Sequence, residues 1–240
     1  MSTKLLNVVE WTRPFISNML LLNDATIEPA TTNANILLGT MLGAPFVWEW
    51  NRATTTFTCV VATTDYVQVM TDYGFMETAH LTVPMSATQD QGIIYQMTPQ
   101  RQLEKTSQPG RPGYISTFLD DQAGNITFRV GGSAPEQAYP VVITYQKAPT
   151  KFTNISAVVP IPDKLMHIFK YGFLALAFLY AQDDRFAAMN QKFIATLLGS
   201  QQGLDATQKN IFLGTWYTML TDQAGIGLTV QQAVQARGAQ

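Results

Sequence analysis

The stretch from Tyr171 to Ala181, YGFLALAFLYA, carries no charge and decides the fold of this chain. It follows two proline-bearing segments, Tyr145–Pro149 (YQKAP) and Val159–Asp163 (VPIPD), which predict a strand that stops at a proline and then an extended linker. Phenylalanine and leucine fall on every side of a helix with this sequence, so it has no face suited to water. A membrane span needs about 20 apolar residues, and Lys170 and His167 interrupt the run too early. The pattern predicts a helix buried in a core or an assembly.

A second apolar helix follows after a very short loop. Asp183 and Asp184 supply a turn and an N-cap, and apolar residues then recur at helical spacing as far as Gly199. Two helices joined so closely lie antiparallel, as a helical hairpin. We expect its core to consist of Leu174, Leu176 and Phe178 against Phe186, Met189 and Phe193. A purely structural hairpin accounts for all of these residues.

The composition limits the possible functions. The chain has 240 residues, of which 46% are hydrophobic and only 13% charged, against about 25% charged in an ordinary soluble domain. A surface with so few charges is suited to large contacts between subunits. The net charge of −2 argues against tight binding of nucleic-acid phosphates. Cys59 is the one cysteine, which excludes an internal disulfide and a cysteine zinc site, and we expect it to be buried.

The order of patterns along the chain predicts an α+β protein. Residues 1–53 and 151–222 read as helical and should pack as one helical domain, with an antiparallel β-domain inserted at residues 54–150 and an extended tail at 223–240. The β-domain could be a sandwich or a small barrel. Its expected strands are Thr54–Val61, Tyr66–Met70, Met76–Val83, Gly92–Met97, Tyr114–Leu119, Ile126–Val130 and Val141–Tyr145.

Local signals place the remaining helices. Pro14 suits the first turn of a helix that runs toward Leu22. A second helix should end at Gly43 and Pro45. Asp205 can cap a third helix after the hairpin, with Phe212, Trp216 and Leu220 on its apolar face.

Motifs for catalysis or for cofactor binding are absent from the sequence. There is no nucleophile elbow, no phosphate-binding loop and no zinc-protease motif. His80 and His167 share no local motif, while the pairs Asp120–Asp121 and Asp183–Asp184 read as turn and cap residues. We therefore predict no catalytic residue, no cofactor and no metal site. No secretory signal follows Met1, so we expect the chain to fold in a cytoplasm.

A series of short motifs, taken in order, resembles a known family. The motifs are Pro45–Arg52, Asp65–Tyr66, Gly124–Val130, Tyr145–Pro149, Pro160–Asp163, Gly172–Leu174 and Asp183–Phe186. They resemble the head-to-tail adaptor proteins, also called neck or connector proteins, of tailed bacteriophages. The likeness covers about residues 10 to 200, and the strand, the Pro-Ile-Pro-Asp linker and the hairpin are its most specific part.

The resemblance implies a structural protein of the virion neck and not an enzyme. Such a subunit forms a ring of about twelve copies beneath the capsid portal, since a ring must match the symmetry of its neighbour. The ring extends the DNA channel, lets genomic DNA pass without specific binding, and docks tail or nozzle proteins. No membrane is involved.

Two other functions remain open. One is a tail terminator or another tail-completion protein, which would form a six-fold ring. The other is a carbohydrate-binding or hydrolytic β-domain, which would need carboxylates and exposed aromatic residues in one cleft. Tyr73, Tyr95 and Tyr114 are the only candidates for that cleft.

Two segments are candidates for docking within an adaptor. Gln100–Gly113 is polar and should form an exposed loop, in which Arg101, Lys105 and Arg111 could contact a tail protein. The tail from Gln223 to Gln240 should become ordered only when it docks onto the portal. Its candidate contact residues are Ile226, Leu228, Val230, Val234 and Arg237.

Overall fold

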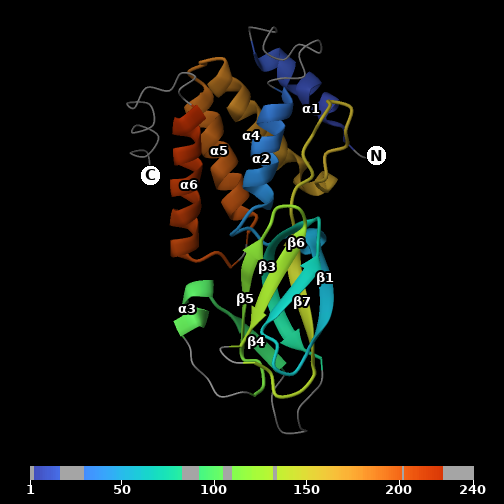
Figure 1. Ribbon diagram of the computed structural model, residues 1–240. Helices are drawn as coiled ribbons and strands as arrows, with labels where there is room; N and C mark the ends of the chain where they lie inside the picture. The colour runs from blue at the N-terminus through green and yellow to red at the C-terminus, as the bar shows by residue number, and fades with distance from the viewer. Residues whose placement is uncertain are drawn as a thin grey trace. The chain divides into compact units, whose positions relative to one another are not determined.

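The chain folds into two compact units of different secondary structure (Figure 1). The computed structural model describes residues 3–16, 30–82, 92–104, 110–131, 134–201 and 203–223. A helical unit comprises Met1–Phe46 and Pro149–Gln240, and a β unit comprises Val47–Ala148. The predicted α+β class is confirmed, because helices from both ends of the chain flank an inserted sheet.

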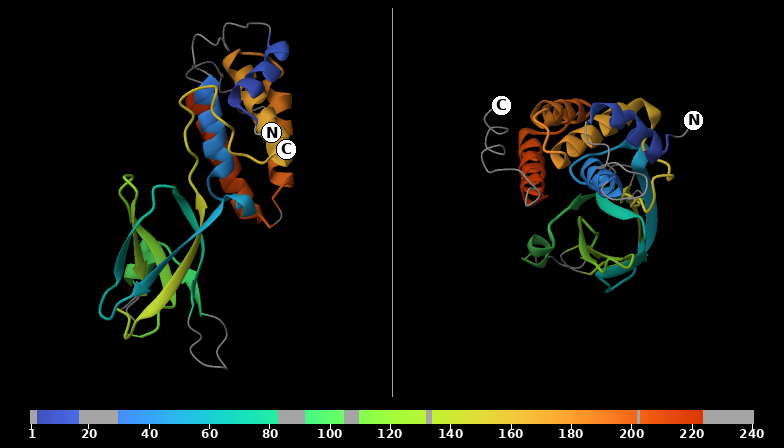
Figure 2. Two further views of the ribbon diagram at one scale, coloured as in Figure 1. Left: turned by 90° about the vertical axis from the view of Figure 1, so that its right-hand side faces the viewer. Right: turned by 90° about the horizontal axis from the view of Figure 1, so that it is seen from above.

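The helical unit is built from both ends of the chain, and its helices α2, α4 and α5 run alongside one another (Figure 2). Its elements are α1 (Leu5–Thr12), η1 (Arg13–Phe15), α2 (Ala30–Leu42), η4 (Asp163–Leu165), α4 (Met166–Tyr180), α5 (Phe186–Gly199) and α6 (Ala206–Gln223).

The amino-terminal helix differs from the predicted one. It ends at Thr12, before Pro14, which lies in the single 3-10 turn η1, and Ile16 is already extended. Proline fits the tight first turn of either helix type, so its position alone did not specify which helix it belongs to. The rest of the expected helix, toward Leu22, lies outside the described residues.

Helix α4 is covered by other helices of the same chain. All its residues from Gly172 to Phe178 are buried, and α4 packs against α1, α2 and α5. At Gly172 an added methyl group would press into the side chains of Leu37 on α2 and Phe193 on α5. Glycine is therefore required for three helices to meet this closely. The predicted buried helix is confirmed, and one copy of the chain supplies the cover.

The linker before α4 is fixed to the amino-terminal helices. The side chain of Asn35 on α2 donates to the Phe152 carbonyl over 3.1 Å and accepts from the Phe152 amide over 2.6 Å. The amide of Val159 donates to the carbonyl of Thr3 over 2.9 Å. These bonds hold an extended segment in which the side chains of Phe152, Val159 and Ile161 are buried.

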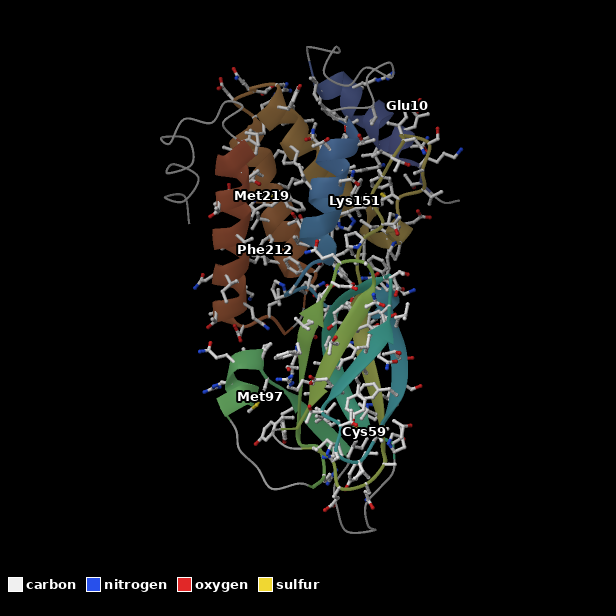
Figure 3. The ribbon with its side chains drawn as sticks, in the orientation of Figure 1. Glu10, Cys59, Met97, Lys151, Phe212 and Met219 are labelled. Atoms are coloured by element: carbon white, nitrogen blue, oxygen red, sulfur yellow. The ribbon has the colours of Figure 1, made fainter. Side chains whose placement is uncertain are left out.

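Helix α6 completes the helical unit, and Figure 3 labels Phe212 and Met219 on it. Asp205 caps the helix as predicted: its carboxylate accepts from the Gln208 amide over 2.7 Å, and the Gln208 side chain accepts from the Asp205 amide over 3.1 Å. The buried Trp216 donates its indole N–H to Asn190 of α5 over 2.9 Å. Phe212 packs edge-on against Phe46, with ring centroids 4.8 Å apart.

The β unit contains one nearly closed, barrel-like sheet. Its elements are η3 (Glu49–Asn51), β1 (Arg52–Cys59), β2 (Asp65–Val69), β3 (Tyr73–Leu81), β4 (Gly92–Gln96), α3 (Pro99–Glu104), β5 (Tyr114–Asp120), β6 (Asn125–Val130) and β7 (Tyr139–Lys147). All seven predicted strands are present, in the order β1-β7-β3-β4-β5-β6-β2. A single curled sheet resolves the choice between sandwich and barrel in favour of the barrel.

The sheet departs from the prediction in one pairing. Strands β4 and β5 run parallel, with Tyr95 opposite Tyr114, whereas every other pair is antiparallel. A parallel pair needs a long crossover between its strands. The segment between Gln96 and Tyr114 supplies that crossover, and it contains α3.

Aromatic rings fill the interior of the sheet. Phe57 stacks on Tyr66 with centroids 5.0 Å apart and on Phe128 with centroids 6.1 Å apart. Cys59 lies in the same core, fully buried as expected, and Figure 3 labels it within the β unit. Burial raises the pKa of its thiol to about 11, so Cys59 is an unreactive core residue.

The predicted loop at Gln100–Gly113 is wrong in its first part. Residues Pro99–Glu104 form α3, because proline at the first position of a helix favours its first turn and good helix formers follow. Residues 105–109 lie outside the described part of the chain. Pro112 is buried, so the end of the segment is not fully exposed either.

Among the described residues, no helix is both long enough and apolar enough to cross a membrane.

Replacing Phe178 with alanine should destabilise the helical unit by about 3–5 kcal/mol, because the change leaves a cavity in a fully packed site. The side chain is 2% exposed. Thermal and urea unfolding of the purified chain measure the loss. Tyr180→Ala, two residues further along the same helix and 37% exposed, is the matched control and should cost much less. Equal losses in the two variants would contradict the assignment of Phe178 to the core.

Candidate interaction surfaces

The residues predicted for the hairpin core lie on two packed helices. Helices α4 and α5 are antiparallel neighbours. Of the six residues, Leu174, Leu176, Phe178, Phe186 and Phe193 are buried, and Met189 is half-buried. These side chains stabilise the helical unit and are not available for a partner.

An arginine in the turn between α4 and α5 joins the hairpin to the amino-terminal segment. Arg185 forms an ion pair with Asp183 at 2.6 Å and donates a second hydrogen bond to the Phe15 carbonyl over 2.7 Å. Its guanidinium also lies over the ring of Phe178, 4.5 Å from the centroid. The hydrogen bonds from Arg185 lower the pKa of Asp183 to about 2. The sequence indicated the turn, but no local pattern could show its contact with Phe15.

A buried glutamine joins the two ends of the β unit. The Gln146 side chain is fully buried on β7; it accepts from the Trp48 amide over 3.1 Å and donates to Glu77 over 2.9 Å. Glu77 on β3 in turn accepts a hydrogen bond from Arg52 over 2.8 Å. Although burial alone would raise the pKa of Glu77, the hydrogen bonds from Arg52 and Gln146 bring it below its ordinary value.

A second side chain makes the same connection. Asn51, also buried, donates to the carbonyl of Lys147 over 2.9 Å. The segments by which the chain enters and leaves the β unit are thus fixed to each other. These two segments contain the motifs Pro45–Arg52 and Tyr145–Pro149, on which the family resemblance partly rests. In the structure, these motifs hold the entry and exit of the β unit together.

The predicted tail-docking residues are only partly described. Arg101 is exposed on α3, whereas Arg111 is half-buried beside Gly110, which forms a β-bridge with Pro135. Lys105 lies outside the described residues, so the structure does not bring the three side chains together. All five predicted portal-docking residues, Ile226, Leu228, Val230, Val234 and Arg237, also lie outside the described part.

The described residues contain no arrangement suited to catalysis. Within them, no three His, Cys, Asp or Glu side chains lie close enough together to hold a metal ion. Asp121 accepts hydrogen bonds from the amides of Ala123 (2.8 Å) and Asn125 (2.9 Å), which shape the turn between β5 and β6. His80 lies on β3 and His167 on α4, both exposed and in different units.

The tyrosines proposed for a carbohydrate site do not form one aromatic surface. Tyr73 is buried in the core of the sheet, where its hydroxyl lies 2.6 Å from that of Thr117. Tyr95 is 65% exposed on β4, and Tyr114 lies opposite it on β5. Tyr73 therefore cannot contribute a ring to an exposed cleft, so the three tyrosines do not form the aromatic surface that a carbohydrate site would need.

Exposed apolar residues gather instead on the β unit. Strand β2 presents Val67 and Val69, which are 60% and 80% exposed, and the turn after β1 presents Val60 and Val61. Period-two patterns in the sequence predicted these strands, but could not show which strands would lie at the edges of the sheet.

Replacing Asp183 with asparagine should lower the thermal midpoint at pH 7, because it removes the ion pair with Arg185. The folded-state pKa of Asp183, about 2, lies below its ordinary value of 3.8. The ion pair therefore stabilises the fold fully above about pH 4, and this contribution is lost as the pH falls from there toward 2. Asp184→Asn, the same change at the exposed neighbour, is the control. A difference between the variants that persists unchanged below pH 2 would contradict this origin.

Replacing Gln146 with alanine should destabilise the β unit by about 1–3 kcal/mol, since the Trp48 amide and the Glu77 carboxylate lose a buried partner. Urea unfolding, followed by tryptophan fluorescence, measures the change. Gln68→Ala on β2, where the side chain bonds only to the adjacent Val67 carbonyl, is the control. A variant as stable as the wild type would show that Gln146 does not fix the two segments.

Comparison with known proteins identifies the family. A search of curated proteins found no match. A family model described as SU10 adaptor protein matches residues 5–212. The match begins with α1, covers the whole β unit and the hairpin, and ends within α6. Since it spans most of the sequence, the resemblance to phage adaptors is confirmed, and the chain belongs to the SU10 adaptor protein family.

Proposed function

We propose that this chain forms a ring of about twelve copies beneath the portal of a phage capsid, where the ring extends the DNA channel and docks the tail. The observation that carries the proposal is the family match over residues 5–212. Membership in that family makes the chain a phage adaptor, a structural component of the virion. The ring, the portal and the tail contacts are the proposed part.

The helical unit has a property that suits a ring subunit. Its most apolar helix, α4, is covered by α1, α2 and α5 of the same chain. A single copy can therefore bury its own core before it meets a neighbour. Assembly then needs only surface contacts, which suits a ring that is added to a capsid already filled with DNA.

The charge balance suits a wall past which DNA slides. The sequence has 15 Lys and Arg against 17 Asp and Glu. Several described cations are already engaged within the chain, since Arg52 pairs with Glu77, Arg129 with Asp65 and Arg185 with Asp183. A surface with few available cations does not hold phosphates tightly. We infer that DNA passes without specific binding.

The docking segments complete the proposal. The carboxy-terminal residues Ile226, Leu228, Val230, Val234 and Arg237 would insert between portal subunits. The region of α3, with Arg101 and Arg111, would contact a tail or nozzle protein. Neither segment needs catalytic chemistry, so the proposed role is structural throughout.

The stoichiometry of the ring tests the proposal. Native mass spectrometry of the purified chain mixed with the portal protein of the same phage should show about twelve copies of the chain per portal ring. Removal of residues 223–240 should abolish the complex, while the free truncated chain should still unfold cooperatively, because the deletion retains the buried side chains of α6 as far as Leu220.

Two results would overturn the proposal. A ring of about six copies with no affinity for the portal would indicate a tail terminator. Turnover of a host polysaccharide that a single carboxylate substitution abolishes would indicate the hydrolytic alternative.

A further inference from the structure

Three lysines gather on one face of the helical unit. Lys164 is exposed in the turn η4 just before α4, Lys170 is half-buried on α4, and Lys192 is exposed on α5. Residues 164, 167, 170 and 171 are spaced by three or four, so they fall on one side of the turn and the helix. Helix α4 packs against both α1 and α5. The side of α4 that carries two of the lysines is therefore flanked by helices that add to the same surface.

Aromatic rings lie beneath two of the ammonium groups. Lys170 Nζ lies 5.5 Å from the ring centroid of Trp11 on α1, and Lys192 Nζ lies 4.2 Å from that of Tyr171 on α4. The ring of His167 stands edge-on to Tyr171, with centroids 6.1 Å apart. These contacts join α1, α4 and α5 into one continuous surface, the lysine face, which comprises Lys164, Lys170 and Lys192 with Trp11, His167 and Tyr171. A ring attracts an ammonium group without neutralising its charge.

The three lysines form no ion pair with any carboxylate of the described residues. The ion pairs within this part of the chain all involve arginine. The acidic residues nearest in sequence are Glu10, beside Trp11, and Asp163, which accepts a hydrogen bond from the Thr3 hydroxyl over 3.4 Å. The lysine face therefore carries positive charge that the described chain leaves available to an anion.

The chemistry of this surface favours a moving polyanion over a protein partner. Lysine is a point charge on a flexible stem, so it can follow a phosphate without the fixed geometry that arginine imposes. Protein interfaces have an apolar centre that is depleted of lysine. Here the two aromatic rings are half-buried, and ammonium groups lie over them. Such a surface suits a phosphate backbone, which is recognised by charge and without regard to base sequence.

We propose that the lysine face lines the DNA channel of the ring and contacts the phosphate backbone of the passing genome. The inference rests on the proposed function and specifies which side of the helical unit is turned toward the axis. Contacts of this kind read no bases and exchange readily with salt ions. They keep the duplex in the channel while it slides, which agrees with passage without specific binding.

The salt dependence of DNA binding tests the lysine face. Fluorescence anisotropy of the full chain with a random-sequence DNA duplex measures the affinity. If three lysines contact phosphates, the affinity should fall about 40-fold between about 50 and about 200 mM monovalent salt. A wild-type chain that does not bind the duplex at the lower salt concentration would overturn the proposal.

Neutral substitutions assign the binding to this face. The triple variant Lys164→Gln, Lys170→Gln, Lys192→Gln keeps most of each stem but removes the charge. It should bind at least about tenfold more weakly at low salt, with an almost flat salt dependence. The matching triple Lys→Arg variant keeps the charge and should bind like the wild type. Lys192→Gln alone, at an exposed position, should reduce the salt slope by about one without disturbing the fold.

A second triple variant is the matched control. Lys147→Gln, Lys151→Gln and Lys209→Gln make the same change in net charge, but these lysines lie on β7, on the linker and on α6. This control should keep the wild-type salt slope and lose less than about threefold in affinity. Both glutamine variants should unfold as cooperatively as the wild type. Equal losses of affinity in the two triple variants would show that net charge, and not the lysine face, binds the DNA.

The remaining outcomes separate this inference from the proposed function. If the lysine-face variant binds DNA like the wild type but no longer joins the portal in native mass spectrometry, the anion is an acidic protein surface and the DNA contact is wrong. If rings form on the portal and the variant behaves like the wild type in both measurements, the lysine face is wrong and the adaptor role stands. If the wild type forms no ring, the proposed function fails and the channel position fails with it.

Discussion

The burial of α4 on every side is the constraint on which the helical unit depends. A helix without charges from Tyr171 to Ala181 has no face for water, so it must be surrounded. Helices α1 and α2 from the amino-terminal part of the chain and the adjacent α5 meet this need, and Gly172 lets α2 and α5 approach closely. The turn at Arg185 and the linker bonds of Asn35 then hold the covering elements in place. Both ends of the chain are required for one core, which is why the sheet has to be inserted between them.

The β unit solves a different problem. Its interior is filled by aromatic residues such as Phe57 and Phe128, and its two chain connections are fixed together by Gln146 and Asn51. Exposed valines remain on this unit, among them Val67 and Val69. The helical unit thus buries its most apolar helix within one copy of the chain, whereas the β unit leaves apolar side chains exposed. This division between a self-contained helical core and exposed apolar residues on the β unit fits a subunit that must fold alone and then assemble.

Local signals predicted much of this fold. Alternation of apolar and polar residues marked all seven strands, and the capping residue Asp205 marked the start of α6. The short loop at Asp183 was sufficient to predict the hairpin, because two helices so joined have few ways to pack. Helix α3 was missed although Pro99 gave a usable signal, since the prolines further along favoured a loop.

Long-range contacts could not be predicted in the same way. The parallel pairing of β4 with β5 depends on where the crossover leads, and not on the residues of either strand. The contact of Arg185 with Phe15 joins residues far apart in the sequence. The buried role of Gln146 is equally invisible, because a glutamine in a strand pattern is expected on the outside. Of the candidate docking residues, the structure describes only Arg101 and Arg111, and it does not place them in one cluster with Lys105.

A density map of the virion neck, resolved well enough to trace this chain, tests the central claim most directly. We expect a ring of about twelve copies of the chain against the portal. Density for the chain at another place in the particle, or its absence from the particle, would contradict the account.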